Sequence, residues 1–295
     1  VKKVTAYFDP GLDKPSSIQY LYRLIDVRAG KNKLLSIIDT YENNLLVSTQ
    51  KAWKDAETVI DPITGETQGI KVAAYRETYE LGLLTSTEKT WRNFDAASGK
   101  VFTYTEIYEG GIRTNIQKAY KDSYKGQLAL IIETYEFNLA APTSIQKIYY
   151  DRVDTGLNGI RIVKVIENWI QLGDKQYQQS MQYAYRMEDT VVVNPLTNGT
   201  QTKNVSAIET YEGDFTASDG YFLTQFQKDY SILYDGRVTR VSSYYDPSLT
   251  DMPTSIQFGY KRKNVDIIET VIDTYESGIH ASTQIIWKKP ESVTN

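Results

Sequence analysis

The chain has 295 residues, of which 41% are hydrophobic, 12% aromatic and 24% charged, and its formal net charge is −4. This composition is typical of a folded protein and excludes a disordered or low-complexity chain. With no Cys and a single His, the chain cannot form disulfides, thiolate metal sites or a two-His metal site. The negative charge, and the absence of an apolar run of ~18 residues, predict neither nucleic-acid binding nor membrane insertion.

One segment, of the form I-E-T-Y-E in its clearest copies, recurs along the whole chain. Clear copies lie at 37–42, 75–80, 104–109, 131–136, 207–212 and 271–276, and weaker ones at 4–9, 165–170 and 241–246. No linker separates these copies. We therefore expect one repeat array over residues 1–295, with nine units centred on Phe8, Tyr41, Tyr79, Tyr108, Tyr135, Trp169, Tyr211, Tyr245 and Tyr275.

A second segment, [S/T]-x-[Q/E]-x-x-aromatic, follows each copy of the first. Its polar centres are Gln19, Gln50, Glu88, Gln117, Gln146, Gln182, Gln227, Gln257 and Gln284. Three residues later an aromatic residue stands in all nine units, at Tyr22, Trp53, Trp91, Tyr120, Tyr149, Tyr185, Tyr230, Tyr260 and Trp287. Such regularity in a chain that is 12% aromatic indicates a genuine repeat.

Each unit is predicted to be a β-hairpin. Both segments are rich in Tyr, Ile, Val, Thr and Trp, which favour strands, and neither has the spacing of a helix face. Between them stand the pairs Asn43-Asn44, Leu81-Gly82, Gly110-Gly111 and Ser277-Gly278, whose Asn and Gly residues tolerate the positive φ of tight hairpin turns.

Two-residue turns at these pairs predict one register. Tyr79 should pair with Leu84, and Glu77 with Ser86. One face would then carry the Tyr, the acid two residues before it, and the Ser/Thr and Gln of the second strand. The other face would carry Thr or Ile with the Lys and the Trp or Tyr of the second strand.

The fold class expected is all-β, a continuous antiparallel meander of about nine β-hairpin repeats. We expect an extended or coiled sheet or solenoid, with a β-propeller or a closed barrel as the alternative. A long open meander would leave two strand edges, which could serve as docking surfaces in an assembly.

No residue stands out as catalytic. The acids Asp39, Glu77, Glu106 and Glu133 recur in successive units, whereas a glycosidase needs its carboxylate pair once, so they are expected to be structural. The lone His280 and the Asp214…Asp219-Gly220 turn match no specific catalytic or calcium site. No metal site and no cofactor are predicted.

The recurring aromatic residues could instead bind a ligand. Sugar rings stack on aromatic faces, so Trp53, Trp91, Tyr120, Tyr149, Tyr185, Tyr230, Tyr260 and Trp287 are the candidate binding row for an extended polymer. The alternative is that these side chains pair across strands and stabilise the sheet.

Tyr234-Asp235-Gly236-Arg237-Val238-Thr239, followed by Tyr244-Tyr245-Asp246, resembles the YD (RHS-type) repeat of bacterial surface and toxin shell proteins. The match covers about one unit. More broadly, segments such as S-I-Q-K-I-Y-Y-D at 144–151 resemble the Tyr-, Ile- and Thr-rich hairpin-repeat structural proteins of tailed bacteriophages. The resemblance implies a structural role in a virion or at a cell surface and supplies no catalytic residue.

The function expected is therefore that of a non-enzymatic structural or adhesive protein, located outside the cell, on its surface or in a virion. Its partners would be copies of itself or other structural proteins, with polysaccharide as a further candidate. A carbohydrate-binding module that uses the aromatic row is the first alternative, and a polysaccharide-degrading enzyme with a carboxylate pair is the second.

Overall fold

The computed structural model describes residues 2–9, 14–26, 33–136, 139, 141–154, 160–173, 175–193, 199–216, 220–234, 237–246, 253–264 and 267–289. Nearly all of them lie in strands, and none lies in a helix. The strands are β1 (Lys2–Phe8), β2 (Ser17–Asp26), β3 (Lys33–Glu42), β4 (Leu45–Ile60), β5 (Thr67–Glu80), β6 (Leu83–Asp95), β7 (Lys100–Glu109), β8 (Ile112–Tyr124), β9 (Gln127–Glu136), β10 (Ser144–Asp154), β11 (Ile160–Leu172), β12 (Lys175–Val193), β13 (Thr200–Gly213), β14 (Tyr221–Tyr234), β15 (Arg237–Tyr245), β16 (Ser255–Asn264), β17 (Ile267–Glu276) and β18 (Ile279–Lys289).

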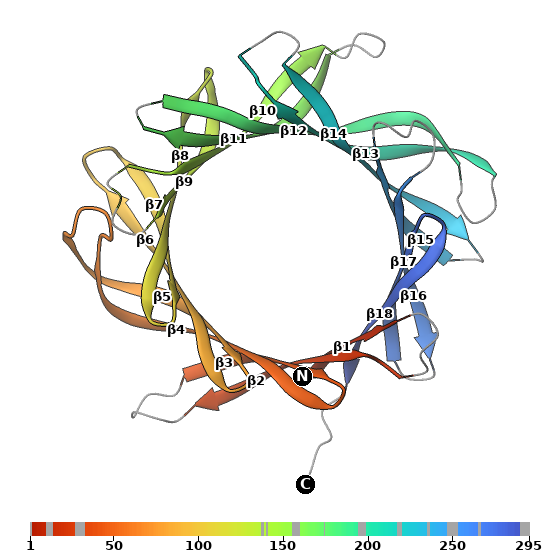
Figure 1. Ribbon diagram of the computed structural model, residues 1–295, viewed down its shortest axis with the longest axis horizontal. Coiled ribbons are helices and arrows are strands. Elements are labelled where there is room, and N and C mark those ends of the chain that lie inside the picture. The colour runs from red at the N-terminus through yellow and green to blue at the C-terminus, as the bar shows by residue number, and fades with distance from the viewer. Residues whose placement is uncertain are drawn as a thin grey trace.

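The strands form one closed antiparallel barrel of 18 strands. Each strand pairs with its neighbours in sequence, and β1 pairs with both β2 and β18, so the last strand meets the first (Figure 1). The predicted all-β antiparallel meander is confirmed. The open extended or coiled sheet is wrong and the alternative of a closed barrel is confirmed, because the ring closes and leaves no free edge among the described strands. Docking by strand edges is therefore excluded for them.

The tight turns have the predicted backbone. Asn43 and Asn44 have φ of 48° and 66°, and the pairs at 81–82, 110–111 and 277–278 are also positive throughout. Two consecutive positive φ values define the type I′ turn, whose twist matches that of paired strands. Leu81 takes this conformation at φ 48° although its side chain favours negative φ.

The register departs from the prediction one residue beyond the turn. Tyr79 pairs with Leu84 as expected, but Thr78 pairs with Ser86 and Glu77 with Thr87. Thr85 is an extra residue, a β-bulge. The same shift occurs beside Tyr41, Tyr108, Trp169, Tyr211 and Tyr275.

The bulges exchange the faces that we predicted for the second strands. The recurring acid and its Tyr share a face with the Lys and the Trp or Tyr of the second strand, and we call this the acid face. The Gln and Ser of the second strand lie with Thr or Ile on the opposite face, which we call the amide face. A shift of one residue moves every side chain of a strand to the other face, which explains the error.

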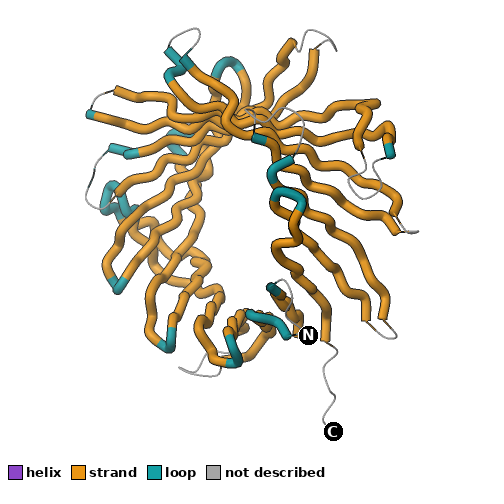
Figure 2. The backbone as a smooth tube through the Cα atoms, turned by 45° about the vertical axis from the view of Figure 1, so that its right-hand side comes forward, coloured by secondary structure: helices purple, strands orange, loops and turns teal. Residues whose placement is uncertain are grey.

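The acid face is the outer face of the barrel. The hairpin of β4 and β5 ends outside the ring (Figure 1), and its tip contacts the acid face of β7, where Tyr104 Oη donates to Asp61 at 2.6 Å. The amide face therefore lines the interior. Figure 2 shows further hairpins spreading away from the barrel axis.

The ring is too wide for side chains to fill it. Its 18 strands, spaced ~4.8 Å apart, give a circumference of at least about 85 Å and a diameter of at least about 27 Å. Side chains fill the interior of barrels with about eight strands, whereas 16–18 strands leave an aqueous channel. Burial therefore occurs on the outer face, where the hairpin arms curve over their neighbours.

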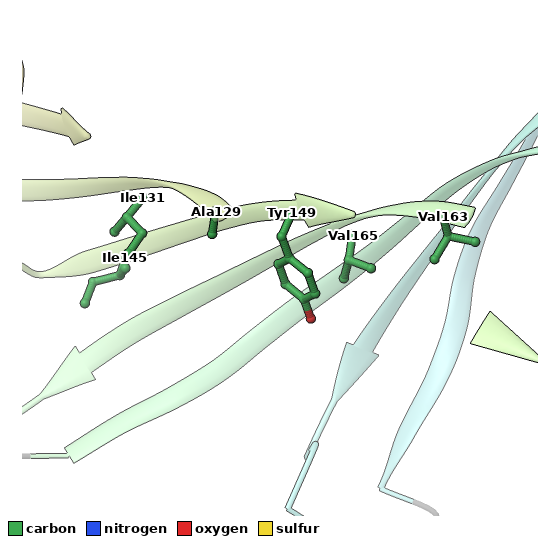
Figure 3. Packing of buried hydrophobic residues seen from close by; sticks show 6 residues of the cluster. All are labelled: Ala129, Ile131, Ile145, Tyr149, Val163 and Val165. Atoms are coloured by element: carbon green, nitrogen blue, oxygen red, sulfur yellow. The ribbon is translucent and has the colours of Figure 1, made fainter. Parts of the chain in front are cut away.

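Three apolar clusters lie on this outer face. One contains Ala129, Ile131, Ile145, Tyr149, Val163 and Val165 from β9, β10 and β11 (Figure 3). The second contains Val192, Val205, Tyr230, Ile232, Val241 and Phe258. The third contains Val59, Ala73, Trp91 and Tyr104. Each large side chain removed from water contributes about 1.5–3 kcal/mol, so the clusters hold the arms against the barrel.

Replacing Leu81 with Asn should raise the free energy of unfolding by about 0.5–1 kcal/mol, because Asn tolerates positive φ better than Leu. Urea denaturation measures this. Leu83→Asn is the control, since Leu83 is equally exposed but lies in a strand, and this change should not stabilise. A loss of stability in Leu81→Asn would contradict the turn assignment.

Candidate functional site

On the outer face, the recurring acids accept hydrogen bonds from the aromatic residues of the preceding strand. The phenol of Tyr149 donates to Glu167 at 2.6 Å and that of Tyr120 to Glu133 at 2.9 Å. The same contact joins Tyr22 to Asp39, Tyr185 to Glu209 and Tyr260 to Asp273. These groups share a face because the pairing of each second strand with the strand that follows it is unshifted at these residues.

A second donor comes from the aromatic residue two positions after the acid in its own strand. Tyr135 donates to Glu133 at 2.8 Å, and the indole of Trp169 to Glu167 at 3.1 Å. Equivalent bonds join Tyr79 to Glu77, Tyr108 to Glu106 and Tyr211 to Glu209. We call an acid held by two aromatic donors a carboxylate clamp; Glu133, Glu167 and Glu209 are complete examples.

The clamps also fix the protonation of their tyrosines. Burial raises the pKa of Tyr22 to about 12, and the hydrogen bond to Asp39 adds to the effect. Burial and the nearby Glu106 raise the pKa of Tyr108 to about 12 as well. Burial, and to a smaller extent the hydrogen bond to Glu133, also raises the pKa of Tyr120. These phenols remain protonated and serve as hydrogen-bond donors.

Glu167 is the most enclosed of these acids, with 1% of its surface exposed. It accepts from Tyr124 and Tyr149, and its Oε1 lies 2.8 Å from Lys125 Nζ on the β8–β9 turn. Burial alone would raise its pKa, but the bonds from Lys125, Tyr149 and Tyr124 outweigh burial and leave the pKa below its usual range. The contact ties a hairpin tip to β11.

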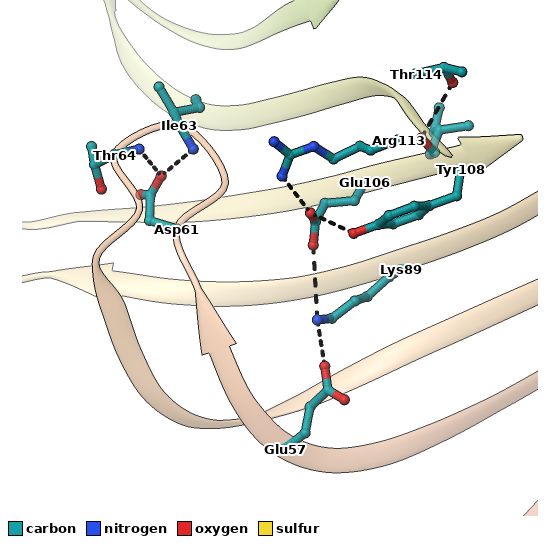
Figure 4. A network of polar contacts seen from close by, with 10 residues as sticks. Glu57, Asp61, Ile63, Thr64, Lys89, Glu106, Tyr108, Arg113 and Thr114 are labelled. Atoms are coloured by element: carbon teal, nitrogen blue, oxygen red, sulfur yellow. Dashed lines mark hydrogen bonds and ion pairs between the residues drawn. The ribbon is translucent and has the colours of Figure 1, made fainter. Parts of the chain in front are cut away.

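A related network joins β4, β6, β7 and β8 (Figure 4). Glu106 is 5% exposed and accepts from Tyr108 at 2.9 Å and Arg113 at 3.0 Å. Lys89 lies 2.5 Å from Glu57 and 3.9 Å from Glu106. Burial raises the pKa of Glu57, but the bonds from Lys89 and Tyr75 leave it lowered. Here too the charged groups bind one another and hold strands together.

All eight residues of the predicted aromatic row lie on the outer face. Trp91, Tyr149 and Tyr230 are buried, at 1%, 3% and 7% exposure, so sugar stacking on them would require their clusters to open. Trp53, Tyr120, Tyr185, Tyr260 and Trp287 are half-buried. Trp53 stacks on Tyr75 and Trp91 on Tyr104, at 5.2 and 5.4 Å between ring centroids. Ligand binding by the half-buried members stays a prediction.

The other candidates form ordinary local contacts. His280 Nε2 lies 2.9 Å from Thr283 Oγ1, and Asp214 caps its own turn through Thr216. Asp219 lies outside the described residues, as do Asp235 and Gly236 of the YD-like segment. Among the residues that the structure describes, no three His, Asp or Glu side chains are grouped to hold a metal. The same residues contain no helix that could span a membrane.

The interior face carries a belt of uncharged amides. Gln146 donates to Asn168 at 2.9 Å, which in turn donates to Ser180 at 2.8 Å. We call this the amide belt; its glutamines are Gln19, Gln50, Gln117, Gln146, Gln182, Gln227, Gln257 and Gln284. Glu88 takes the remaining place and pairs with Arg76 at 2.8 Å. Such groups can hydrogen-bond a polar ligand without selecting its charge.

Positive charges lie beyond this belt on the same face. They are nearest the terminal end, the end of the barrel where β1 begins and β18 finishes. Most follow a belt glutamine by four residues, which is ~13 Å along a strand. We call them the cationic belt: Lys3, Arg23, Lys54, Arg92, Lys121, Arg152, Arg186, Arg240 and Lys261. All nine are exposed, and none forms an ion pair with another described residue.

Negative charges mark the opposite end of the interior, which we call the turn end. The last residue of the I-E-T-Y-E segment lies on the interior face, and this acidic rim consists of Glu42, Glu80, Glu109, Glu136, Glu212 and Glu276. Five of these acids pair across the turn with exposed apolar residues. We call these the apolar crown: Leu45, Leu83, Ile112, Phe222 and Ile279, each 64–74% exposed.

The sequence analysis missed the cationic belt and the crown. The signal was a Lys or Arg four residues after the Gln or Glu in seven of the nine second segments, as in Gln117 and Lys121. Period-two alternation places both residues on one face. Only the closure of the barrel shows that this face encloses an interior.

No family model, no curated protein and no solved structure matches this chain.

Replacing Glu167 with Gln should lower the free energy of unfolding at pH 7 by about 2–4 kcal/mol, because four donors lose a charged acceptor. Since the folded pKa of Glu167 is lowered, its contribution is present above the unfolded pKa and disappears as pH falls through the folded one. Urea denaturation from pH 7 to 3 should therefore show the difference between Glu167→Gln and wild type shrinking with acid.

The matched control is Glu136→Gln on the exposed rim, which should change stability by less than about 0.5 kcal/mol. A difference between Glu167→Gln and wild type that is constant from pH 7 to 3 would contradict the charged clamp.

Proposed function

We propose that this protein is a non-enzymatic structural element of an assembly outside the cell, at a cell surface or in a virion. The carboxylate clamps support the proposal most directly. The recurring acids that could form a catalytic pair are held by aromatic donors, lysines or arginines on the outer face, as Glu167 is by Tyr149 and Lys125. We take these acids to stabilise the shape of the sheet.

The apolar crown is the surface on which we expect assembly to occur. Its five side chains project beside the acidic rim at one end of the barrel, each at least 64% exposed. Apolar groups that gather on one exposed surface mark interaction sites more often than scattered ones do. Because the described strands leave no free edge, association has to use side-chain surfaces, and of these we choose the crown. We take the partner to be a second copy of the chain.

Light scattering coupled to size-exclusion chromatography tests this proposal. The wild-type chain should associate reversibly with rising concentration. Leu83→Ser combined with Ile112→Ser should weaken association at least tenfold without lowering the melting temperature by more than a few degrees. Leu233→Ser, an exposed interior residue outside the crown, is the control and should associate normally.

A wild-type chain that stays monomeric at every concentration would contradict assembly through the crown. Cleavage of any polysaccharide, abolished by replacing one Asp or Glu while the fold is kept, would instead establish an enzyme.

A further inference from the structure

We propose that the free ends of the hairpin arms bind the surface of a membrane that contains anionic phospholipids. In this contact, exposed apolar side chains enter the boundary between headgroups and acyl chains, and neighbouring Lys and Arg residues pair with the lipid anions. The contact is peripheral, involves none of the apolar crown, and does not rest on self-association.

The arms begin where neighbouring hairpins separate. The pairing of β7 with β8 ends at Thr103 and Ala119. Within its own hairpin, β7 stays paired to β6 as far as Lys100, and β8 stays paired to β9 as far as Tyr124. The described pairings therefore leave the far part of these hairpins without a neighbouring strand, and Figures 1 and 2 show the arms spreading from the barrel.

The acid face of these arms is turned toward the barrel wall. Tyr124 on the β8–β9 arm donates to Glu167 of β11, and Asp61 at the tip of the β4–β5 arm accepts from Tyr104 of β7. Apolar residues on this face are covered, as Ala129 is at 0% exposure. The amide face of the arms therefore points away from the barrel.

Large apolar side chains are exposed on this outward side. Phe94 and Val101 pair on the β6–β7 arm and are 62% and 53% exposed. Leu233 and Val238 pair on the β14–β15 arm and are 62% and 70% exposed. Three other arms carry Val72, Leu128, Tyr150 and Ile162 on the same face, each 61–69% exposed. We call these the arm patches; exposed apolar groups that recur in this way mark an interaction surface.

Each arm patch has a member of the cationic belt beside it. Arg92 lies two residues before Phe94 on the same face of β6, and Arg152 pairs with Ile162. The other three arms carry Lys54, Lys121 and Arg240. Past the point where the arms separate, this face of β6–β9, β14 and β15 has no Asp or Glu among the described residues. The patches are therefore positively charged although the net charge of the chain is −4.

This combination matches an anionic lipid surface better than other partners. Proteins that bind single-stranded nucleic acid use aromatic side chains on which bases stack, whereas most residues of the arm patches are aliphatic. A two-fold contact between copies would place the same cations opposite one another. An anionic bilayer takes up apolar side chains and attracts Lys and Arg at the same interface.

The arrangement of the arms allows several contacts at once. The described arms all leave the barrel at the terminal end, because the tight turns lie at the other end. Several patches can therefore reach one membrane together, and simultaneous contacts raise the affinity above that of a single patch. Anionic lipid would repel the acidic rim, so the terminal end should face the bilayer.

Co-sedimentation with large unilamellar vesicles tests the proposal. The vesicles contain phosphatidylcholine alone or an equimolar mixture of phosphatidylcholine and phosphatidylserine, and binding is measured at rising salt. The apolar arm variant is Phe94→Ser/Leu128→Ser/Leu233→Ser. Its control, Leu46→Ser/Leu84→Ser/Leu172→Ser, changes three exposed leucines at the turn end that lie outside the crown.

A second pair of variants tests the charges. The charge variant Arg92→Gln/Lys121→Gln/Arg240→Gln removes a cation from each of three arm patches. Its control, Lys71→Gln/Lys203→Gln/Arg237→Gln, removes three cations from the acid face, so both variants have the same net charge.

We expect wild type to bind the mixed vesicles at low salt, to bind pure phosphatidylcholine at least tenfold more weakly, and to be released by salt, which screens the charges. The apolar arm variant and the charge variant should each lose at least tenfold in affinity, while their controls lose less than threefold. Melting temperatures near that of wild type confirm that the variants fold.

Absence of binding to the mixed vesicles, or equal losses in the test variants and their controls, would overturn the proposal. So would tighter binding of a poly-dT oligonucleotide than of the mixed vesicles. Loss of reversible self-association in the apolar arm variant would also overturn it, because the arms would then contact a second copy of the chain.

Discussion

The structure depends on one extra residue beside the turn of each regular hairpin. In the β5–β6 hairpin, Thr85 has no partner, and every pair beyond it shifts by one position. This shift decides which side chains meet. It places the Lys and the Trp or Tyr of the second strand on the face that carries the acid of the first strand, and it directs the Gln or Glu of the second strand to the other face. The acids of successive units therefore share the outer face, where the unshifted pairing with the preceding strand brings each to its aromatic donor.

Repetition of the bulge produces two faces with different tasks. The outer face carries aromatic rings, carboxylates and lysines that bind one another, and the hairpin arms fold over it to form the apolar clusters. Between a ring of acids and a ring of cations, the interior face carries mostly uncharged amides, together with the Arg76–Glu88 pair and Asp229. Because nine hairpins, six of which carry the bulge, close on themselves, the charges that a flat sheet would spread over a plane are brought to face a common space.

Much of the architecture could be predicted from the sequence. The repeated Tyr and Gln positions located the hairpins, and pairs such as Asn43-Asn44 located turns with two positive φ values. The faces could not be predicted, because a single bulge at Thr85 reverses them and leaves little trace in composition. Closure could not be predicted either, since local patterns fix neighbouring pairs but say nothing about whether β18 returns to β1.

The candidate sites show the same division. The aromatic row was found from its spacing, but its burial depends on arms that curve over the outer face, as at Trp91. The spacing of Gln117 and Lys121 was visible, yet its meaning depends on which face encloses the interior. A residue type that recurs in each repeat unit does not stand out in the sequence, whereas a catalytic residue is recognised because it occurs once.

Disulfide trapping tests the bulged register most directly, because the chain has no Cys of its own. In the structure Arg76 pairs with Glu88, whereas a hairpin without the bulge would pair Arg76 with Thr87. The account predicts that Arg76→Cys/Glu88→Cys forms an intramolecular disulfide under mild oxidation, measured by thiol titration and mass spectrometry, and that Arg76→Cys/Thr87→Cys does not. Efficient bonding in the second variant and none in the first would contradict it.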